Sequence, residues 1–286
     1  MGTATALRPA SPPPEAPRLA DAEFQQVRAL IHRHAGIRLS PDKQAMVYGR
    51  LSRRLRETGH DSFARYLQAL ERGTGAAAAR ELQAFVNSLT TNLTSFFREE
   101  HHFPVLAARL RALAARPSPV RVWCCAASTG EEPYSLAMTA IETLAPPSDV
   151  RIVATDIDTD VLAHAAAGIY PVGAGSLDDG RRRRHFLRGT GRNEGSMRVG
   201  PELRRRVEFA FLNLTAPDGW AVEGPFDVVF CRNVLIYFDA PTQRRVFERL
   251  HGLMPRGALL FVGHSETAGD ARSLFQPCGQ TVYARV

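Results

Sequence analysis

The hydrophobic pattern of this chain changes near residue 119, and that change limits the folds open to it. No strand-like run precedes this point; beyond it, short apolar runs alternate with helical segments. Such alternation is typical of a parallel sheet covered by helices on both faces. The predicted strands are Val120–Ala126, Val150–Asp156, Val207–Leu212, Phe226–Cys231, Ala258–Gly263 and Thr281–Arg285. The predicted helices between them are Pro133–Leu144, Asp158–Ala167 and Pro241–Met254.

The part before residue 119 is predicted to be an all-α unit. Asp21 is placed to cap a first helix, and Ser40-Pro41 is a favourable start for a second. Asp61 begins a third helix, and an Ala-rich helix follows. The four helices are expected over residues 21–34, 41–58, 61–72 and 75–88. Residues 1–18, rich in proline and alanine, are expected to form a flexible tail.

Composition narrows the class of protein. The 286 residues are 44% apolar and 23% charged, which is ordinary for a globular protein of one or two domains. No run approaches the ~20 apolar residues that span a bilayer, and the N-terminus lacks an apolar signal core. We therefore expect a cytoplasmic protein without membrane insertion. The net charge is +7, with most of the surplus before residue 96, which favours an acidic partner.

The cysteines do not predict a metal site. Cys124, Cys125, Cys231 and Cys278 form no C-x-x-C pair and no cluster with histidine at metal-binding spacing. We expect reduced thiols and no bound metal.

The ends of the first two strands predict a nucleoside-bearing cofactor, because ligands of open parallel sheets bind beyond the carboxyl ends of the strands. The first strand leads into Ser128-Thr129-Gly130-Glu131-Glu132, and the second ends at Asp156, which could accept hydrogen bonds from ribose hydroxyls. The loop is not G-x-G-x-x-G, and its two acidic residues would repel a diphosphate. They suit the cationic S-adenosylmethionine, which we favour over NAD.

Five stretches stand in order along the chain: LTTNLTSFFRE (89–99), AASTGEEPYS (126–135), DID (156–158), FDVVFCRNVLIYF (226–238) and GHSE (263–266). Together they resemble the CheR family of chemotaxis receptor methyltransferases, from about residue 20 to the C-terminus. The resemblance implies an α/β protein: an all-α N-terminal domain, then a Rossmann-like class I S-adenosylmethionine-dependent methyltransferase domain with a small inserted β subdomain. The corresponding ranges are 19–90 for the helical domain, 91–118 for a linker and helix, 119–286 for the methyltransferase domain and about 172–205 for the insertion.

The resemblance also implies the site residues. Arg98 and Tyr237 are the candidate catalytic residues, because a guanidinium can hold a carboxylate with two hydrogen bonds and a phenol can donate one more. His264 is interpreted as structural. The implied cofactor contacts are Asn92, Thr94, Arg98, Glu132, Asp156, Asn213, Leu214, Arg232 and Asn233.

The implied activity is that of a protein-glutamate O-methyltransferase in sensory adaptation. It would convert S-adenosylmethionine to S-adenosylhomocysteine and receptor glutamates to methyl esters. A glutamate with a pKa near ~4.3 is already ionised at neutral pH, so no general base is needed. The expected partner is the cytoplasmic domain of chemotaxis receptors, and the enzyme, expected to be a monomer, would be recruited to membrane receptor arrays.

Two regions are candidates for substrate docking. In the second helix, a basic face suits the acidic methylation region of a receptor; its residues are Arg50, Arg53, Arg54 and Arg56. In the insertion, Gly189, Gly191, Gly195 and Arg198 match a subdomain that, in some family members, binds a receptor C-terminal peptide at a sheet edge. The sequence leaves open whether this chain does so.

Other functions are less well supported. Nucleic-acid enzymes that methylate amino groups carry Asn/Asp-Pro-Pro-Tyr after the fourth strand, whereas residues 232–237 read RNVLIY. Cys231 has no neighbour that would activate it as the nucleophile of a C5-cytosine enzyme. A non-catalytic binding module would be expected to have lost Asp156 or Gly130-Glu131-Glu132. The alternative that we keep is an S-adenosylmethionine-dependent methyltransferase acting on another protein or on nucleic acid.

Overall fold

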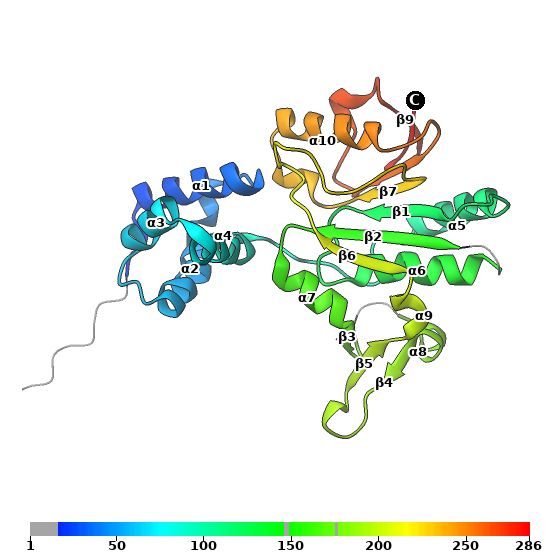
Figure 1. Ribbon diagram of the computed structural model, residues 1–286, viewed down its shortest axis with the longest axis horizontal. Coiled ribbons are helices and arrows are strands. Elements are labelled where there is room, and N and C mark those ends of the chain that lie inside the picture. Colours follow the sequence, from blue (N-terminus) through cyan, green and yellow to red (C-terminus); the bar gives the residue numbers. More distant parts are fainter. Residues whose placement is uncertain (1–16, 146–148, 175–176) are drawn as a thin grey trace, which may run out of the picture.

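The computed structural model describes residues 17–145, 149–174 and 177–286, so nearly all of the predicted flexible tail lies outside it. The chain forms a helical unit followed by a larger unit built on a sheet (Figure 1). In the helical unit, a short 3-10 turn, η1 (Pro41–Lys43), precedes the second helix. The helices are α1 (Asp21–Ala35), α2 (Gln44–Thr58), α3 (Phe63–Arg72) and α4 (Gly75–Leu89).

The helical unit has its own core, as the sequence predicts. Apolar side chains at helical spacing, such as Val27 and Ile31 on α1 and Leu51 and Leu55 on α2, pack into one buried cluster. Two helix starts differ from the prediction: α2 begins at Gln44, after the 3-10 turn, rather than at residue 41. The third helix starts at Phe63, because Ser62 rather than Asp61 accepts the capping hydrogen bond from the N–H group of Arg65.

The second unit contains a seven-stranded sheet in the order β6-β2-β1-β7-β8-β10-β9. The strands from β6 to β8 are parallel, and β10 and β9 continue the sheet as antiparallel strands. The strands are β1 (Val120–Cys124), β2 (Val150–Asp156), β6 (Val207–Phe211), β7 (Val228–Cys231), β8 (Leu259–Val262), β9 (Phe275–Gly279) and β10 (Val282–Arg285). The helices are α5 (His102–Leu113), α6 (Glu131–Thr143), α7 (Thr159–Ala167) and α10 (Ala240–Gly252).

Alternation along the strands places a separate hydrophobic core on each face of the sheet. On β1, Val122 and Cys124 face the cluster that includes α5 and α6, whereas Trp123 faces the cluster that includes α10. Both faces are therefore buried, which explains why the parallel strands read as short, almost continuous apolar runs. This confirms the predicted doubly covered parallel sheet.

The sequence analysis missed one strand and misplaced the start of the insertion. Strand β9 pairs only with β10 and is largely exposed beyond Phe275, so it has no apolar alternation to reveal it. The insertion is a three-stranded sheet, β3-β5-β4, that begins at Ile169, before the expected residue 172. Its elements are β3 (Ile169–Pro171), α8 (Asp179–His185), β4 (Phe186–Arg188), β5 (Ser196–Val199) and α9 (Pro201–Arg204).

The two units are joined by hydrogen bonds as well as by the chain. The N–H group of Arg38 donates to the carbonyl oxygen of Tyr237 at 2.9 Å. The side-chain amide of Asn213 donates to the carbonyl oxygen of His34 at 2.7 Å. Gly36, with a φ of +68°, packs so closely that an added Cβ would lie 2.5 Å from Thr215. The connection between α1 and α2 is thus held against the sheet unit. Within the described residues, no helix combines the length and apolarity needed to cross a membrane.

Candidate active site

A pocket lies where the order of the parallel strands reverses. From β1, the chain continues outward to β2 and β6, whereas β7 and β8 lie on the other side of β1. Ligands of open α/β sheets bind at this reversal. All ten residues expected to bind the cofactor or to orient the acceptor line one pocket: Asn92, Thr94, Arg98, Glu132, Asp156, Asn213, Leu214, Arg232, Asn233 and Tyr237.

The helical unit completes this pocket. Residues of the α1–α2 connection and of α2 line it opposite the strand ends, and the linker after α4 also contributes. We call the exposed lining residues the mouth: Arg38, Ser40, Lys43, Thr91 and Leu93. The linker and the α1–α2 connection thus both cover the strand ends, and no motif indicated the contribution of the α1–α2 connection.

Asp156, at the end of β2, is buried at the bottom of the pocket. Its two carboxylate oxygens accept hydrogen bonds from the N–H groups of Ser128 at 2.8 Å and Asp158 at 3.0 Å. Burial raises the pKa of Asp156 to about 6. A carboxylate has about four lone-pair sites, so these two bonds leave it able to accept from further donors, such as vicinal hydroxyl groups.

Asp158 fixes the linker relative to the sheet. One of its oxygens caps α7 by accepting from the N–H groups of Asp160 and Val161. The other accepts from the hydroxyl of Thr90 at 2.6 Å and the amide of Asn92 at 2.8 Å. Asp158, rather than Asp156, is therefore the N-cap of α7, which leaves Asp156 free for a ligand.

An ionic network lies beneath the pocket. The fully buried guanidinium of Arg232 pairs with Glu132 and, at 3.1 Å, with Glu99. It also donates to the carbonyl oxygen of Arg98 at 2.6 Å. Burial alone would raise the pKa of Glu99, but Arg232, together with Asn233 and His264, lowers it to about 2. The pocket thus keeps ionised carboxylates close to a buried cation.

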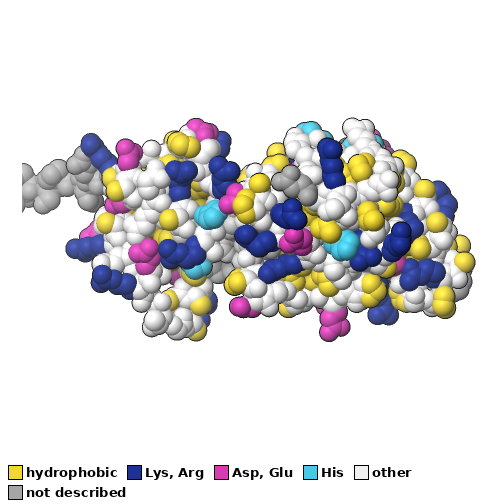
Figure 2. Space-filling model, turned by 90° about the horizontal axis from the view of Figure 1, so that it is seen from above, with side chains coloured by type: hydrophobic (Ala, Val, Ile, Leu, Met, Phe, Trp, Pro, Cys, Tyr) yellow, Lys and Arg dark blue, Asp and Glu magenta, His cyan; other side chains and the backbone are white. Residues whose placement is uncertain are grey.

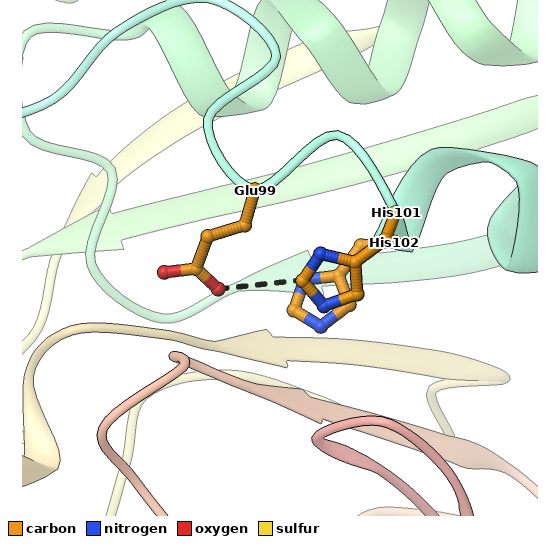
Figure 3. Close-up of side chains that lie close together, drawn as sticks. All are labelled: Glu99, His101 and His102. Atoms are coloured by element: carbon orange, nitrogen blue, oxygen red, sulfur yellow. Dashed lines mark ion pairs between the residues drawn. The ribbon is translucent and has the colours of Figure 1, made fainter.

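Figure 3 shows Glu99 beside His101 and His102, a set of residue types that could ligate a metal. The arrangement does not favour one. The same Glu99 oxygen that faces His102, at 3.8 Å from its Nδ1, is already paired with Arg232, whose positive charge would repel a divalent cation. Burial lowers the pKa of His102 to about 4, so its imidazole is neutral at pH 7.

Arg98 is held in a strained part of the linker. The residues on either side of it, Phe97 and Glu99, have φ values of 55° and 57°, a backbone conformation that residues other than glycine rarely adopt. The guanidinium of Arg98 donates to the carbonyl oxygen of Leu93 at 2.7 Å and is half-buried at the pocket. This leaves further donors on Arg98 for an acceptor carboxylate.

Asn213 and Tyr237 border both units. The side chain of Asn213 is engaged with the backbone of His34 and Thr215, so contact with an adenine from this residue would have to come mainly from its backbone. Tyr237 follows β7 in the 3-10 turn η3 (Leu235–Tyr237). Within the described residues, its hydroxyl has no hydrogen-bond partner, so it is available to a ligand.

The four arginines of the docking face predicted on α2 differ in their partners within the chain. Arg50 donates to the carbonyl oxygens of Ser88 and Thr90, and Arg54 pairs with Glu81 and Glu57. Both therefore stabilise the helical unit. Arg56 is exposed. Arg53, with 75% of its side chain exposed, pairs at the surface with Glu57 and with no other residue that the structure describes. Figure 2 shows Lys and Arg side chains over both units on the face that it displays.

The glycines of the insertion have local roles in the β4–β5 connection. A Cβ on Gly189 would lie 2.0 Å from the carbonyl oxygen of Asn193 in the same turn, and Gly191 and Gly195 have positive φ. These glycines are explained by the turn itself and need no bound peptide. Arg198 lies exposed on the central strand β5 of this small sheet.

Sequence reasoning missed several contributors. His264, expected to be structural, contacts Glu99 at 3.1 Å, at the edge of the ionic network. Glu266 is buried and accepts from the N–H groups of Gly263, Asn233 and Ile236, and so fixes the turn that carries Tyr237. The GHSE stretch was the available signal for both. Ser128 lies in the AASTGEEPYS stretch but was not expected as a lining residue, and Arg38 lines the pocket without any motif that marks it.

The fold and the pocket define a class: a Rossmann-like S-adenosylmethionine-dependent methyltransferase. Residues 22–90 match the model "CheR methyltransferase, all-alpha domain", and residues 92–284 match "CheR methyltransferase, SAM binding domain". The chain therefore belongs to the CheR methyltransferase family.

Two curated relatives illustrate the similarity. Chemotaxis protein methyltransferase 2 of Pseudomonas aeruginosa is 50% identical over 266 residues, covering 92% of each chain. The chemotaxis protein methyltransferase of Escherichia coli is 49% identical over 268 residues, covering 93% of this chain and 91% of the relative. The two domains predicted from the sequence are thus those of the family.

Proposed function

We propose that this protein transfers a methyl group from S-adenosylmethionine to glutamate side chains of methyl-accepting chemotaxis receptors and so forms methyl esters. The observation that carries the proposal is the division of charge in the pocket. Its buried lining holds the ion pair of Glu132 with Arg232 and, in addition, the carboxylate of Asp156, whereas its mouth holds the cations Arg38 and Lys43. Acidic groups suit a cationic cofactor, and a basic mouth suits an anionic acceptor.

The pocket fits the cofactor through its donor and acceptor set. Asp156 has unused lone pairs for two ribose hydroxyls, and Glu132 carries negative charge next to the strand β1 loop. Asn213 and Leu214 would lie along the adenine by their backbone, with Asn92, Thr94, Arg232 and Asn233 completing the wall. When bound, S-adenosylmethionine supplies an electrophilic methyl group on a sulfonium.

The remaining work of the protein is to place the acceptor. An ionised carboxylate needs no general base, so alignment and removal of water dominate, and alignment alone can supply roughly 7–11 kcal/mol of the barrier. Arg98 would hold the carboxylate through its free guanidinium donors, and Tyr237 would donate one hydrogen bond. These hydrogen bonds must not be too strong, because the carboxylate loses its charge in the transition state and strong bonds would stabilise the ground state more.

We also propose that docking uses the exposed arginines Arg53 and Arg56 on α2, and that the partner is the cytoplasmic part of receptors in membrane arrays. In this proposal the protein works as a monomer, from the cytoplasm, with neither a metal nor a nucleic acid. Binding of a receptor C-terminal peptide by the inserted β subdomain stays a separate possibility, for which Arg198 is the exposed candidate contact.

The test is methyl transfer to receptor-bearing membranes. With labelled S-adenosylmethionine, the receptors should acquire label that base releases as methanol, as expected for a methyl ester. Membranes without receptors should stay unlabelled. Label that resists base, or that enters nucleic acid instead, would refute the proposed function.

A further inference from the structure

The mouth of the pocket holds a cation that the proposed mechanism does not use. Arg38 lines the cavity with its side chain exposed, and its guanidinium has no hydrogen-bond or ion-pair partner within the part of the chain that the structure describes. Lys43, also at the mouth, pairs with Asp42 at 3.0 Å. The five N–H donors of the Arg38 guanidinium are therefore available to a ligand.

The backbone that carries Arg38 is fixed next to the reacting centre. Its own N–H group donates to the carbonyl oxygen of Tyr237 at 2.9 Å. Before Arg38 in the chain, the carbonyl oxygen of His34 accepts a hydrogen bond from the side chain of Asn213. After it, the carbonyl oxygen of Leu39 accepts one from the guanidinium of Arg28 at 2.7 Å. The guanidinium of Arg38 is free, its backbone is fixed, and it lies beside Tyr237, a candidate catalytic residue. This arrangement suits a residue that recognises a substrate.

The other charged groups of the lining show what this guanidinium can bind. The two lining carboxylates, Glu132 and Asp156, are buried and have partners of their own. Arg98 is half-buried and contacts a backbone carbonyl, that of Leu93. The lining cation Arg232 is buried and paired with Glu132. An anion that enters through the mouth thus meets Arg38 as an exposed cation with no ion-pair partner among the described residues.

We propose that Arg38 binds a second carboxylate of the acceptor segment, distinct from the carboxylate that is methylated. This inference rests on the proposed function. The reacting carboxylate is not its partner, since two guanidiniums on one nucleophile would stabilise the charged ground state more than the neutralised transition state. Arg38 is thus a specificity-determining residue, which favours acceptor segments with an acidic neighbour.

A consequence is that methylation of one acid would weaken the binding of the enzyme to the same segment. When the neighbouring acid is itself methylated, it loses the charge that Arg38 binds. The affinity of the enzyme for the segment should then fall as methylation proceeds, without any change at the cofactor site.

The experiment measures initial rates with a soluble cytoplasmic receptor fragment that the wild-type protein methylates. In Arg38→Gln, KM for the fragment should rise about five-fold, while kcat and cofactor affinity stay within two-fold. Arg33→Gln is the matched control: Arg33 is exposed on α1 but does not line the pocket, so the same charge change should alter KM less than two-fold. Arg38→Lys should fall between wild type and Arg38→Gln, because it keeps the charge without the planar fork.

A second set of fragments identifies the bound carboxylate. Acidic residues around one acceptor are changed to glutamine one at a time. One such change should raise KM for the wild type to the level of Arg38→Gln, yet leave KM of Arg38→Gln itself unaltered.

Each other result refutes the inference. These results are an unchanged KM in Arg38→Gln, an equal rise in Arg33→Gln, a loss confined to kcat, or no acid whose removal reproduces the effect. If the wild type methylates no receptor fragment, the proposed function fails and this inference fails with it. A methylating wild type with an unaffected Arg38→Gln variant refutes the inference alone.

Discussion

Replacement of Asp156 by asparagine tests the cofactor site most directly. The side chain is buried at the end of β2, and its oxygens are held by the N–H groups of Ser128 and Asp158. Asparagine keeps the shape but removes the negative charge and one of the two acceptor oxygens. The change therefore weakens the acceptor that the ribose hydroxyls would use. It keeps the side-chain volume but turns an NH2 group toward one of the two backbone N–H donors, so thermal unfolding of the variant is measured alongside.

The expected loss follows from the strength of a hydrogen bond to a charged group. Such a bond contributes roughly 1.5–3 kcal/mol, which corresponds to a rise in Kd of roughly 10- to 150-fold. Asp160→Asn is the matched control. Asp160 is exposed in the first turn of α7, four residues further along the chain, and its replacement should leave cofactor affinity unchanged.

The pH dependence gives a second signature of Asp156. Because burial raises its pKa to about 6, the ligand-free carboxyl gains a proton as the pH falls through 6, and the ribose loses its charged acceptor. Between pH 7.5 and pH 5.0 the apparent Kd should rise roughly ten-fold. The contribution of Asp156 to folding stability changes with pH in the opposite direction to its contribution to cofactor binding. A folded-state pKa above the unfolded value gives Asp156 a favourable contribution below about pH 4, which is lost as the pH rises through 6.

Isothermal titration of S-adenosylmethionine at several pH values measures both effects. In Asp156→Asn the affinity should be low and nearly independent of pH over this range. A variant that binds with wild-type affinity, or that keeps the full wild-type pH dependence, would show that another group receives the ribose.

Three further outcomes are expected. Tyr237→Phe should lower kcat at least ten-fold with cofactor affinity unchanged, since the lost hydrogen bond is made to the acceptor; wild-type turnover would remove Tyr237 from that role. Charge reversal of Arg53 and Arg56 together should raise KM for receptor in a salt-dependent way while cofactor binding is kept; normal kinetics across a salt series would mean an ordinary solvated helix face. Gly36→Ala should lower both thermal stability and cofactor affinity, because its Cβ would meet Thr215 at 2.5 Å where the two units join; unchanged calorimetry and titration would contradict that reasoning.

Local patterns were enough to predict the parts of the fold that bury apolar surface regularly. The strand Val150–Asp156 agrees with the prediction residue for residue, because its buried positions are apolar up to Ala154, apart from the exposed Arg151, and the strand ends in a carboxylate. Strand β9 could not be predicted in this way. Gln276, Pro277 and Cys278 are exposed at the sheet edge, so their only strand signal is backbone pairing, which leaves no mark in the sequence.

The site was predictable where motifs mark it and not where distant partners decide. All ten residues expected to bind the cofactor or to orient the acceptor line one pocket. By contrast, the roles of Arg50 and Arg54 depend on Thr90 and Glu81, which lie 40 and 27 residues away along the chain. On a helix diagram Arg50 and Arg54 lie nearer than Arg53 and Arg56 to the buried face of Val47, Leu51 and Leu55, but the diagram does not show their partners. Only the packing of α4 against α2 separates structural from exposed cations.

The shared wall of the pocket limits how the two units can evolve. The connection between α1 and α2 lines the pocket opposite the strand ends and leads directly into the helix that carries Arg53 and Arg56. If α2 docks the receptor as proposed, a substitution there that changes receptor choice can therefore shift the surface that lines the cofactor pocket. The helical unit is not an exchangeable adaptor: a chimaera that grafts it from a distant relative would inherit a foreign half of the active site. The residues for partner recognition and those for catalysis in this chain must therefore evolve together.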